Sequence, residues 1–191
     1  MNQYIKTIIF VIIVISCIFS ILYFGREYIS STLFQETKVS PESNIQGNVT
    51  IGSKAPYFSL QSYQGENINS SDTADNPLVI TFWSTWNSES IDQVKIFDDY
   101  QLGISNKNKD MSARIILVNS QESKEVVSNI MRRGNYDLEV LLDQNGEVSN
   151  LYGVHTLPTT FFIDRSGDIV EIFTGTMNKN ELINKMEGII F

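Results

Sequence analysis

Two side chains that could take part in chemistry lie where an apolar strand is followed by a helix. Residues 78–83 form an apolar run and residues 88–103 have a helical pattern, so Asn87 and Ser90 fall at the start of that helix. The amide of Asn87 is neutral and is not an effective nucleophile, and no base adjoins the hydroxyl of Ser90. Asn87 and Ser88 are both good helix caps. The pattern favours a capping role for Asn87, with a binding role as the alternative.

Two further segments contain residue types that bind metals, but neither forms a convincing site. His155 is the sole histidine, and no cysteine or second histidine accompanies it, so it predicts neither a zinc site nor catalysis. Residues 143–147 (Asp-Gln-Asn-Gly-Glu) are superficially similar to a calcium loop but lack its spaced acidic ligands. An Asn-Gly turn between a strand and a helix explains them. The sequence therefore predicts no metal site and no cofactor.

Composition limits the partners that the protein can have. The chain of 191 residues has 22 acidic and 14 basic side chains, a net charge of −8, and 42% hydrophobic residues. This length accommodates one domain of about 100 to 150 residues with an appendage. Nucleic acids and anionic bilayer surfaces select basic proteins. We therefore expect an ordinary globular domain that binds no nucleic acid.

The N-terminus is predicted to anchor the protein in a membrane. Residues 7–24 include no charge and, as a helix, span roughly 27 Å, close to the hydrocarbon thickness of about 30 Å. Lys6 on one flank favours a cytoplasmic N-terminus at residues 1–6, although Arg26 on the other flank weakens the bias. This orientation makes the chain a single-pass membrane protein with its domain on the extracytoplasmic side.

Two alternatives to an uncleaved helix remain open. A cleaved signal peptide is one, but no small-x-small cleavage site follows the apolar run. The other is a lipoprotein processing box at residues 14–17, which would make Cys17 a lipid-modified N-terminus. A mature lipoprotein usually becomes polar after this cysteine, whereas the residues after Cys17 stay apolar. The uncleaved helix and the lipoprotein alternative both attach the domain to a membrane, on the side outside the cytoplasm.

Residues 25–46 have the composition of a flexible tether, and residues 47–191 that of a folded domain. Within the domain, apolar and helical patterns alternate. Strands are expected at residues 55–60, 64–68, 78–83, 114–118, 138–142, 160–163 and 169–173, and helices at residues 88–103, 123–133, 147–152 and 180–190. This alternation, which ends in a hairpin and a helix, predicts an α/β fold with a mixed central sheet flanked by helices.

Four segments of the domain have a distinctive order and spacing. They are Ala-Pro-x-Phe-x-Leu at residues 55–60, the strand and turn at residues 79–90, the loop and strand at residues 153–164, and the turn at residues 174–177. Together they resemble the membrane-anchored thioredoxin-like proteins of the TlpA/ResA type, within the redoxin superfamily, in which residues 79–90 would be the active-site strand and turn. The resemblance covers about residues 47–190 and implies a thioredoxin-like fold. The predicted N-terminal anchor fits it as well.

The resemblance implies a catalytic site whose reactive residues are replaced here. In this family a cysteine at the helix N-terminus attacks a substrate disulfide, and a second cysteine one turn later resolves the mixed disulfide. Asn87 and Ser90 occupy these positions, and Gln93 occupies that of a frequent glutamate. Cys17, the sole cysteine, belongs to the predicted membrane segment. Neither dithiol exchange nor cysteine-based peroxidase chemistry is therefore expected.

Pro158 matches the proline loop of the family, and the resemblance implies a cis bond before it, although most X–Pro bonds are trans. In thioredoxin folds this loop faces the active-site turn, and its backbone pairs with an extended peptide without needing a thiol. The residues expected to line this groove are Trp83, Trp86, Asn87, Thr156, Leu157 and Pro158. Trp83 has a second interpretation as a core aromatic.

Three functions remain compatible with these patterns. The first is a non-catalytic module that binds extended protein segments, or serves as a scaffold, in envelope thiol-redox chemistry or cytochrome maturation. The second is a thiol-disulfide oxidoreductase or peroxidase-like enzyme, as the resemblance suggests, which would have to borrow a thiol or a small cofactor. The third is a structural envelope protein that kept the fold for stability. The replacement of both cysteines favours the first.

Overall fold

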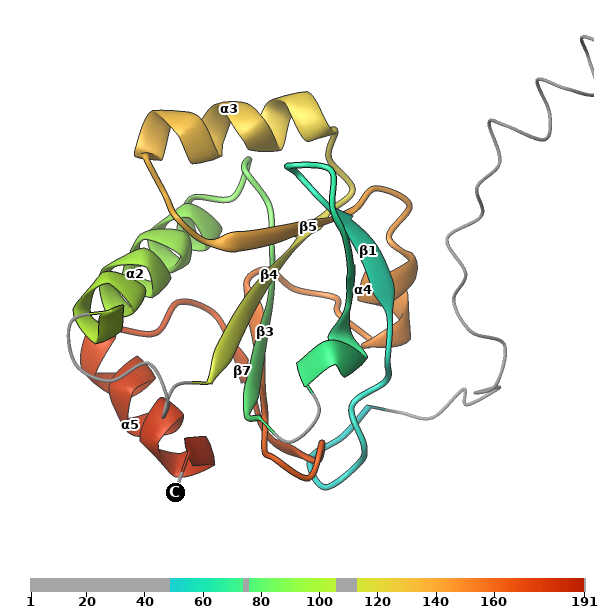
Figure 1. Cartoon of the computed structure of the whole chain (residues 1–191), viewed down its shortest axis with the longest axis vertical. Helices are drawn as coiled ribbons and strands as arrows, with labels where there is room; N and C mark the ends of the chain where they lie inside the picture. Colours follow the sequence, from blue (N-terminus) through green and yellow to red (C-terminus); the bar gives the residue numbers. More distant parts are fainter. Residues whose placement is uncertain (1–48, 74–75, 106–112, 191) are drawn as a thin grey trace, which may run out of the picture. The chain divides into compact units, whose positions relative to one another are not determined.

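The computed structural model describes residues 49–73, 76–105 and 113–190 of the chain (Figure 1). The predicted cytoplasmic end, membrane anchor and tether, at residues 1–6, 7–24 and 25–46, lie outside the described residues, as does Cys17. Within the described ranges, no helix is both long and apolar enough to cross a bilayer.

Among the described residues, seven strands form one mixed sheet in the order β2-β1-β5-β4-β3-β6-β7. The strands are β1 (Ser59–Ser62), β2 (Asn67–Asn69), β3 (Leu78–Trp83), β4 (Arg114–Ser120), β5 (Glu139–Asp143), β6 (Thr159–Ile163) and β7 (Ile169–Thr174). The central β3, β4 and β5 are parallel, and the remaining neighbours are antiparallel. The helices are the 3₁₀ helix η1 (Ser70–Thr73), α2 (Ser88–Ser105), α3 (Lys124–Gly134), α4 (Glu147–Leu151) and α5 (Lys179–Ile190).

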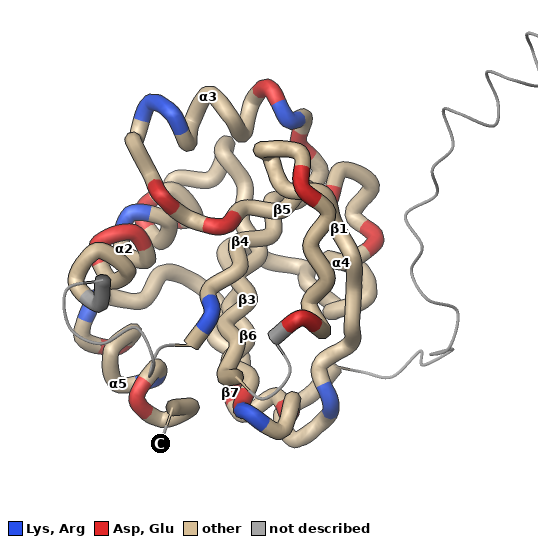
Figure 2. Tube along the Cα trace, viewed as in Figure 1, with Lys and Arg blue, Asp and Glu red and all other residues tan. Residues whose placement is uncertain are grey.

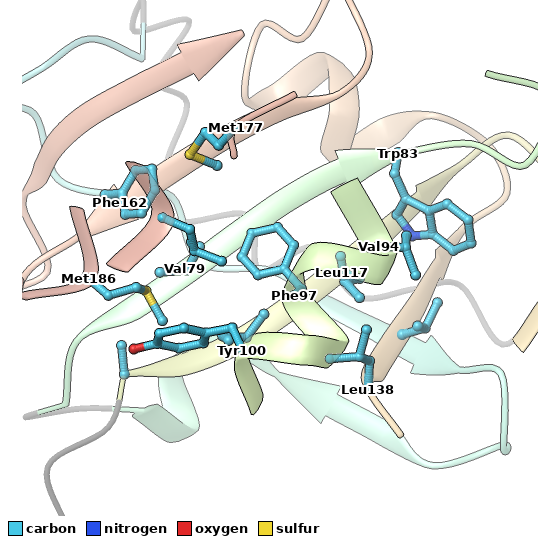
Figure 3. Packing of buried hydrophobic residues seen from close by; sticks show 14 of the residues in the cluster. Val79, Trp83, Val94, Phe97, Tyr100, Leu117, Leu138, Phe162, Met177 and Met186 are labelled. Carbon is cyan, nitrogen blue, oxygen red and sulfur yellow. The ribbon is translucent and has the colours of Figure 1, made fainter. Parts of the chain in front are cut away.

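Helices cover the two faces of the sheet unequally. The long helices α2, α3 and α5 pack on one face, and the short α4 packs on the other (Figure 1). Because successive residues of a strand point to opposite faces, Val79 and Trp83 of β3 join the first cluster, while Ile80 and Phe82 join the second. Figure 3 shows the first cluster, in which Phe97 of α2 lies among residues of β3 and β4. The buried β3 thus forms the centre of both cores.

The face covered by α4 contains an aromatic cluster around Tyr152. The Tyr152 ring lies 5.0 Å from that of Phe161 and 5.3 Å from that of Phe82, measured between ring centroids. Its hydroxyl donates a hydrogen bond to the carbonyl of Pro56 at 2.7 Å. Burial raises the pKa of the Tyr152 hydroxyl well above its ordinary value.

We expect Tyr152 to reduce the free energy of unfolding at alkaline pH. Because its pKa is raised in the folded protein, the unfolded chain loses the phenolic proton first. The stabilisation is complete below about pH 10 and falls above it by up to about 1.4 kcal/mol per pH unit. Urea unfolding from about pH 8 to about pH 11 should show a steeper loss for wild type than for Tyr152→Phe. Tyr152→Phe also loses the hydrogen bond to Pro56, which lowers its free energy of unfolding by the same amount at every pH. Only the slope against pH therefore tests the prediction, and equal slopes for the two proteins would contradict it.

The expected mixed sheet flanked by helices is confirmed, and from residue 78 onwards each expected element matches an observed one to within two residues. The strand expected at residues 55–60 is wrong over residues 55–58, because β1 begins only at Ser59. Pro56 has no N–H to donate to a neighbouring strand. The N–H of Ala55 donates instead to Gly167 in the β6–β7 turn, at 3.0 Å. This segment therefore crosses the end of the sheet rather than extending it.

The second strand of the first hairpin is also displaced, from the expected residues 64–68 to Asn67–Asn69. The turn before it takes up the difference, since the N–H of Ser62 donates to the carbonyl of Glu66 at 2.7 Å. Gly65 has φ of 109° there, a conformation that favours glycine. The 3₁₀ helix η1 that follows is not among the expected elements.

Candidate functional site

The pairing of β3 with β6 brings the two halves of the predicted site together. In this antiparallel pair, Phe82 lies opposite Thr159. The turn that follows β3 and the loop that precedes β6 must therefore meet at the same end of these two strands. Asn87 and Leu157, which are 70 residues apart in the sequence, come into direct contact there.

Asn87 is the cap of α2 and also the link to the proline loop. Its Oδ1 accepts a hydrogen bond from the N–H of Ser90 at 2.9 Å, the interaction that defines an N-cap. Its Nδ2 donates to the carbonyl of Leu157 at 3.0 Å. The capping role predicted for Asn87 is confirmed, and the same amide also makes a tertiary contact.

The proline loop itself is closely fixed. The peptide bond between Leu157 and Pro158 is cis, and Pro158 is buried. The carbonyl of Pro158 accepts the N–H of Gly175 at 2.9 Å, which joins it to the end of β7. The hydroxyl of Thr159 donates to the carbonyl of Thr156 at 2.7 Å. These bonds leave the backbone of Leu157 as the part of the loop that faces α2.

Ser90 and Gln93 lie beneath the turn and are completely buried. Gln93 Oε1 accepts the N–H of Met177 at 2.7 Å, so this side chain fixes the connection between β7 and α5. The hydroxyl of Thr176 donates to the carbonyl of Glu89 at 3.0 Å and fixes the same connection. The hydroxyl of Ser90 and Nε2 of Gln93 have no hydrogen-bond partner among the described residues. The Gln93 position thus has a structural use here.

Glu122 is a site residue that the sequence analysis missed. Its carboxylate accepts the N–H of Thr85 at 2.6 Å, the hydroxyl of Thr85, and Nδ2 of the buried Asn119 at 2.7 Å. The preceding Gln121 has φ of 60°, a left-handed conformation that directs the chain back toward the turn. The sequence does contain one signal for Glu122: it comes shortly after β4, at the end where the carboxyl ends of the parallel strands β3, β4 and β5 meet. Glu122 holds the turn that carries Trp86 and Asn87.

The two tryptophans of the predicted groove differ completely in exposure. Trp86 is 72% exposed, whereas Trp83 is 0% exposed and belongs to the core under α2. The expectation that Trp83 lines the groove is therefore wrong, and its second interpretation as a core aromatic is correct. Thr156 is exposed and Leu157 is half-buried. The surface beside Asn87 thus combines a free indole ring with the backbone of an ordered loop.

His155, three residues before Pro158, is exposed. Among the described residues, no group of three metal-ligating side chains comes together. Asp143, in the segment weighed as a calcium loop, instead caps α4. Its carboxylate accepts the N–H groups of Val148 at 3.2 Å and Ser149 at 2.7 Å. The arrangement can position a turn and present a binding surface, and it places no thiol in that surface.

Comparison with known proteins agrees with this architecture. The model of the AhpC/TSA family matches residues 51–172. The chain is 32% identical over 139 residues to the thiol-disulfide oxidoreductase ResA of Bacillus subtilis (strain 168), covering 73% of this chain and 75% of ResA. It is 31% identical over 142 residues to ResA of Geobacillus kaustophilus, covering 74% of this chain and 79% of that protein.

Solved structures show the same fold. A thiol:disulfide interchange protein DsbE from Chlorobium tepidum superposes with a TM-score of 0.67 at 23% identity, covering 75% of this chain and 99% of that chain. The C-terminal domain of a thiol-disulfide oxidoreductase from Bacteroides thetaiotaomicron gives a TM-score of 0.61 at 28% identity, covering 75% and 98%. The fold is thus the thioredoxin-like α/β fold, and the chain belongs to the AhpC/TSA family, with the ResA thiol-disulfide oxidoreductases among its relatives.

Proposed function

We propose that this protein is a non-catalytic thioredoxin-like module that binds extended segments of other proteins. One observation carries the proposal. At the position where the family has its attacking cysteine, the Asn87 amide has its oxygen bound to the N–H of Ser90 and its nitrogen bound to the carbonyl of Leu157. A side chain engaged in this way is a structural part of the site, and it has no group that can exchange electrons.

The retained surface supports binding. Trp86 is 72% exposed, and large exposed aromatic rings are frequent anchors at protein interfaces. The N–H of Leu157 has no hydrogen-bond partner among the described residues. It is a donor with which an extended chain could pair as an added strand. An exposed indole ring one residue before Asn87, together with a free backbone donor on the loop that Asn87 contacts, suits a protein segment better than a small ligand.

The proposed setting is the outer side of a cell membrane. Residues 7–24 would span the bilayer with the N-terminus inside, and residues 25–46 would let the domain reach partners at the membrane surface. Relatives that are thiol-disulfide oxidoreductases suggest clients or partners in envelope thiol-redox chemistry or cytochrome maturation. The module would hold or scaffold these partners while other proteins carry out the exchange.

We expect Trp86→Ala to weaken binding of unfolded, thiol-free polypeptides by roughly tenfold, because it removes a large exposed anchor. The matched control is Tyr57→Ala. Tyr57 is 73% exposed and lines a cavity with Asp164 to Gly167, at the opposite end of the sheet. Fluorescence anisotropy with the full chain in detergent measures both. Equal losses from the two substitutions would mean that binding is non-specific and would count against the proposal.

A second candidate function is the oxidoreductase activity of the relatives, which the identity of 32% to a ResA protein favours. It would require a thiol from outside the domain, because the only cysteine of the chain is Cys17. Turnover of a disulfide by a Cys17→Ser chain would support this candidate. A structural envelope role is the third candidate. Equal losses of polypeptide binding in Trp86→Ala and Tyr57→Ala would favour it.

A further inference from the structure

The backbone of Leu157 is the point at which the proline loop could pair with another chain. Its carbonyl accepts Asn87 Nδ2 at 3.0 Å, while its N–H is unpaired within the described ranges. The neighbouring carbonyls serve the fold: that of Thr156 accepts the Thr159 hydroxyl at 2.7 Å, and that of Pro158 accepts a backbone N–H at 2.9 Å. Leu157 therefore offers one free donor and one acceptor that the chain already uses.

The Asn87 side chain is fixed from the helix side. Its Oδ1 accepts the N–H of Ser90 at 2.9 Å, and its backbone carbonyl accepts the N–H of Ile91 at 3.2 Å. The amide is thus part of the first turn of α2, an 18-residue helix, and its donor is already aimed at the loop. The bond from Asn87 to Leu157 is therefore preorganised, because the Asn87 side chain is already ordered by the helix. A partner that approaches Leu157 has to compete with this bond.

We infer that Asn87 acts as an internal latch that competes with an extended partner for the carbonyl of Leu157. The inference rests on the proposed function. A strand that pairs with one residue of an edge uses both its N–H and its carbonyl. The partner must therefore displace Asn87 Nδ2 or share the carbonyl with it through the second lone pair. Either arrangement weakens pairing through this residue.

The latch also defines the kind of partner that binds. A segment that offers only backbone pairing gains little at a carbonyl that is already occupied. A segment that also places a large apolar side chain on Trp86, which is 72% exposed, gains a contact that the latch does not oppose. The site therefore selects extended segments with an exposed apolar side chain, as unfolded or partly folded chains have.

Two substitutions of Asn87 separate the latch from the helix cap. Serine and aspartate cap helices about as well as asparagine does, so both keep an acceptor for the N–H of Ser90. The serine side chain is shorter and does not reach Leu157, and an ionised aspartate has no hydrogen to donate. Asn87→Ser is neutral and Asn87→Asp is charged, so a shared effect excludes an effect of charge. Asn87→Ala removes cap and latch together.

The probe is a fluorescein-labelled decapeptide of alternating Thr and Leu with a lysine at each end, so that it can pair as a strand and place a large apolar side chain on Trp86. Its cationic ends suit a chain with a net charge of −8, whose acidic side chains are spread over α2, α3 and α5 (Figure 2). With the full chain in detergent, we expect Asn87→Ser and Asn87→Asp to bind the probe roughly three- to tenfold more tightly than wild type, the factor that one net hydrogen bond represents. Their thermal midpoints should fall slightly, because the bond to Leu157 is lost, and should fall less than that of Asn87→Ala, which loses the cap as well.

Each other outcome has a distinct meaning. Equal affinity of wild type, Asn87→Ser and Asn87→Asp overturns the latch, and the proposed function stands if Trp86→Ala still weakens binding. Weaker binding by both capped variants also overturns the latch, because Asn87 would then contact the peptide itself. If neither wild type nor any variant binds the probe, the proposed function fails and the latch with it.

Discussion

Replacing Asn87 and Ser90 together by cysteine is expected to produce a chain that reduces insulin disulfides in the presence of dithiothreitol. A cysteine at position 87 would lie at the N-terminus of the 18-residue α2, where the helix dipole favours the thiolate. Position 90 is completely buried one turn later, where a second thiol could resolve the mixed disulfide. In a Cys17→Ser chain, we expect the rate to rise roughly tenfold or more above the uncatalysed rate.

Single replacements are the matched controls for this gain. Asn87→Cys alone can be trapped in a mixed disulfide but cannot resolve it, and Ser90→Cys alone places a thiol in a buried position. Neither should turn over. Asn87→Cys also loses the cap, worth about 1 kcal/mol, so circular dichroism must show that each variant is folded. Activity of the Cys17→Ser chain without added cysteines would refute the non-catalytic proposal. A folded but inactive double variant would show that the site has changed beyond its two sulfur atoms.

Glu122→Ala is expected to destabilise the domain by about 2 to 3 kcal/mol, more than other single changes near the site. The carboxylate accepts three hydrogen bonds, from the N–H and hydroxyl of Thr85 and from Asn119, and Asn119 is completely buried. Removing a charged acceptor leaves these donors without a partner, and an unpaired buried donor is costly. Urea unfolding of the full chain in detergent measures the loss.

The same variant should loosen the turn that carries Trp86. Amide hydrogen exchange at Thr85 should accelerate, because its N–H loses the acceptor at 2.6 Å. Glu187→Ala is the control: it removes one negative charge from an exposed position on α5 and should change stability by no more than about 0.5 kcal/mol. If the two variants unfolded at the same urea concentration, net charge rather than the Glu122 contacts would explain the effect.

Local patterns were sufficient for most of the architecture. Each strand from β3 to β7 has an apolar pattern of its own, and Asn87 has the chemistry of a cap whatever lies around it. The presence of Asn87 and Ser90 at the start of α2, and of a single cysteine at position 17, is likewise a property of the sequence. The limit of local patterns appears at residues 55–58, where β propensity is overridden by the bond from Ala55 to Gly167, a residue on a distant turn.

Distant contacts decided the details of the site. Trp83 and Trp86 are three positions apart in one segment, yet only their different packing leaves the first buried and the second 72% exposed. Glu122 has no local motif, because its role arises from the adjacency of β3 and β4. The identity of residue 87 follows from the sequence, but its bond to Leu157 exists only because β3 and β6 pair in an antiparallel register. The sequence alone determined that residues 47–191 contain no thiol. The tertiary structure decided that the Asn87 amide bonds to Leu157, because the register of the sheet brings together two residues that are 70 positions apart in the chain.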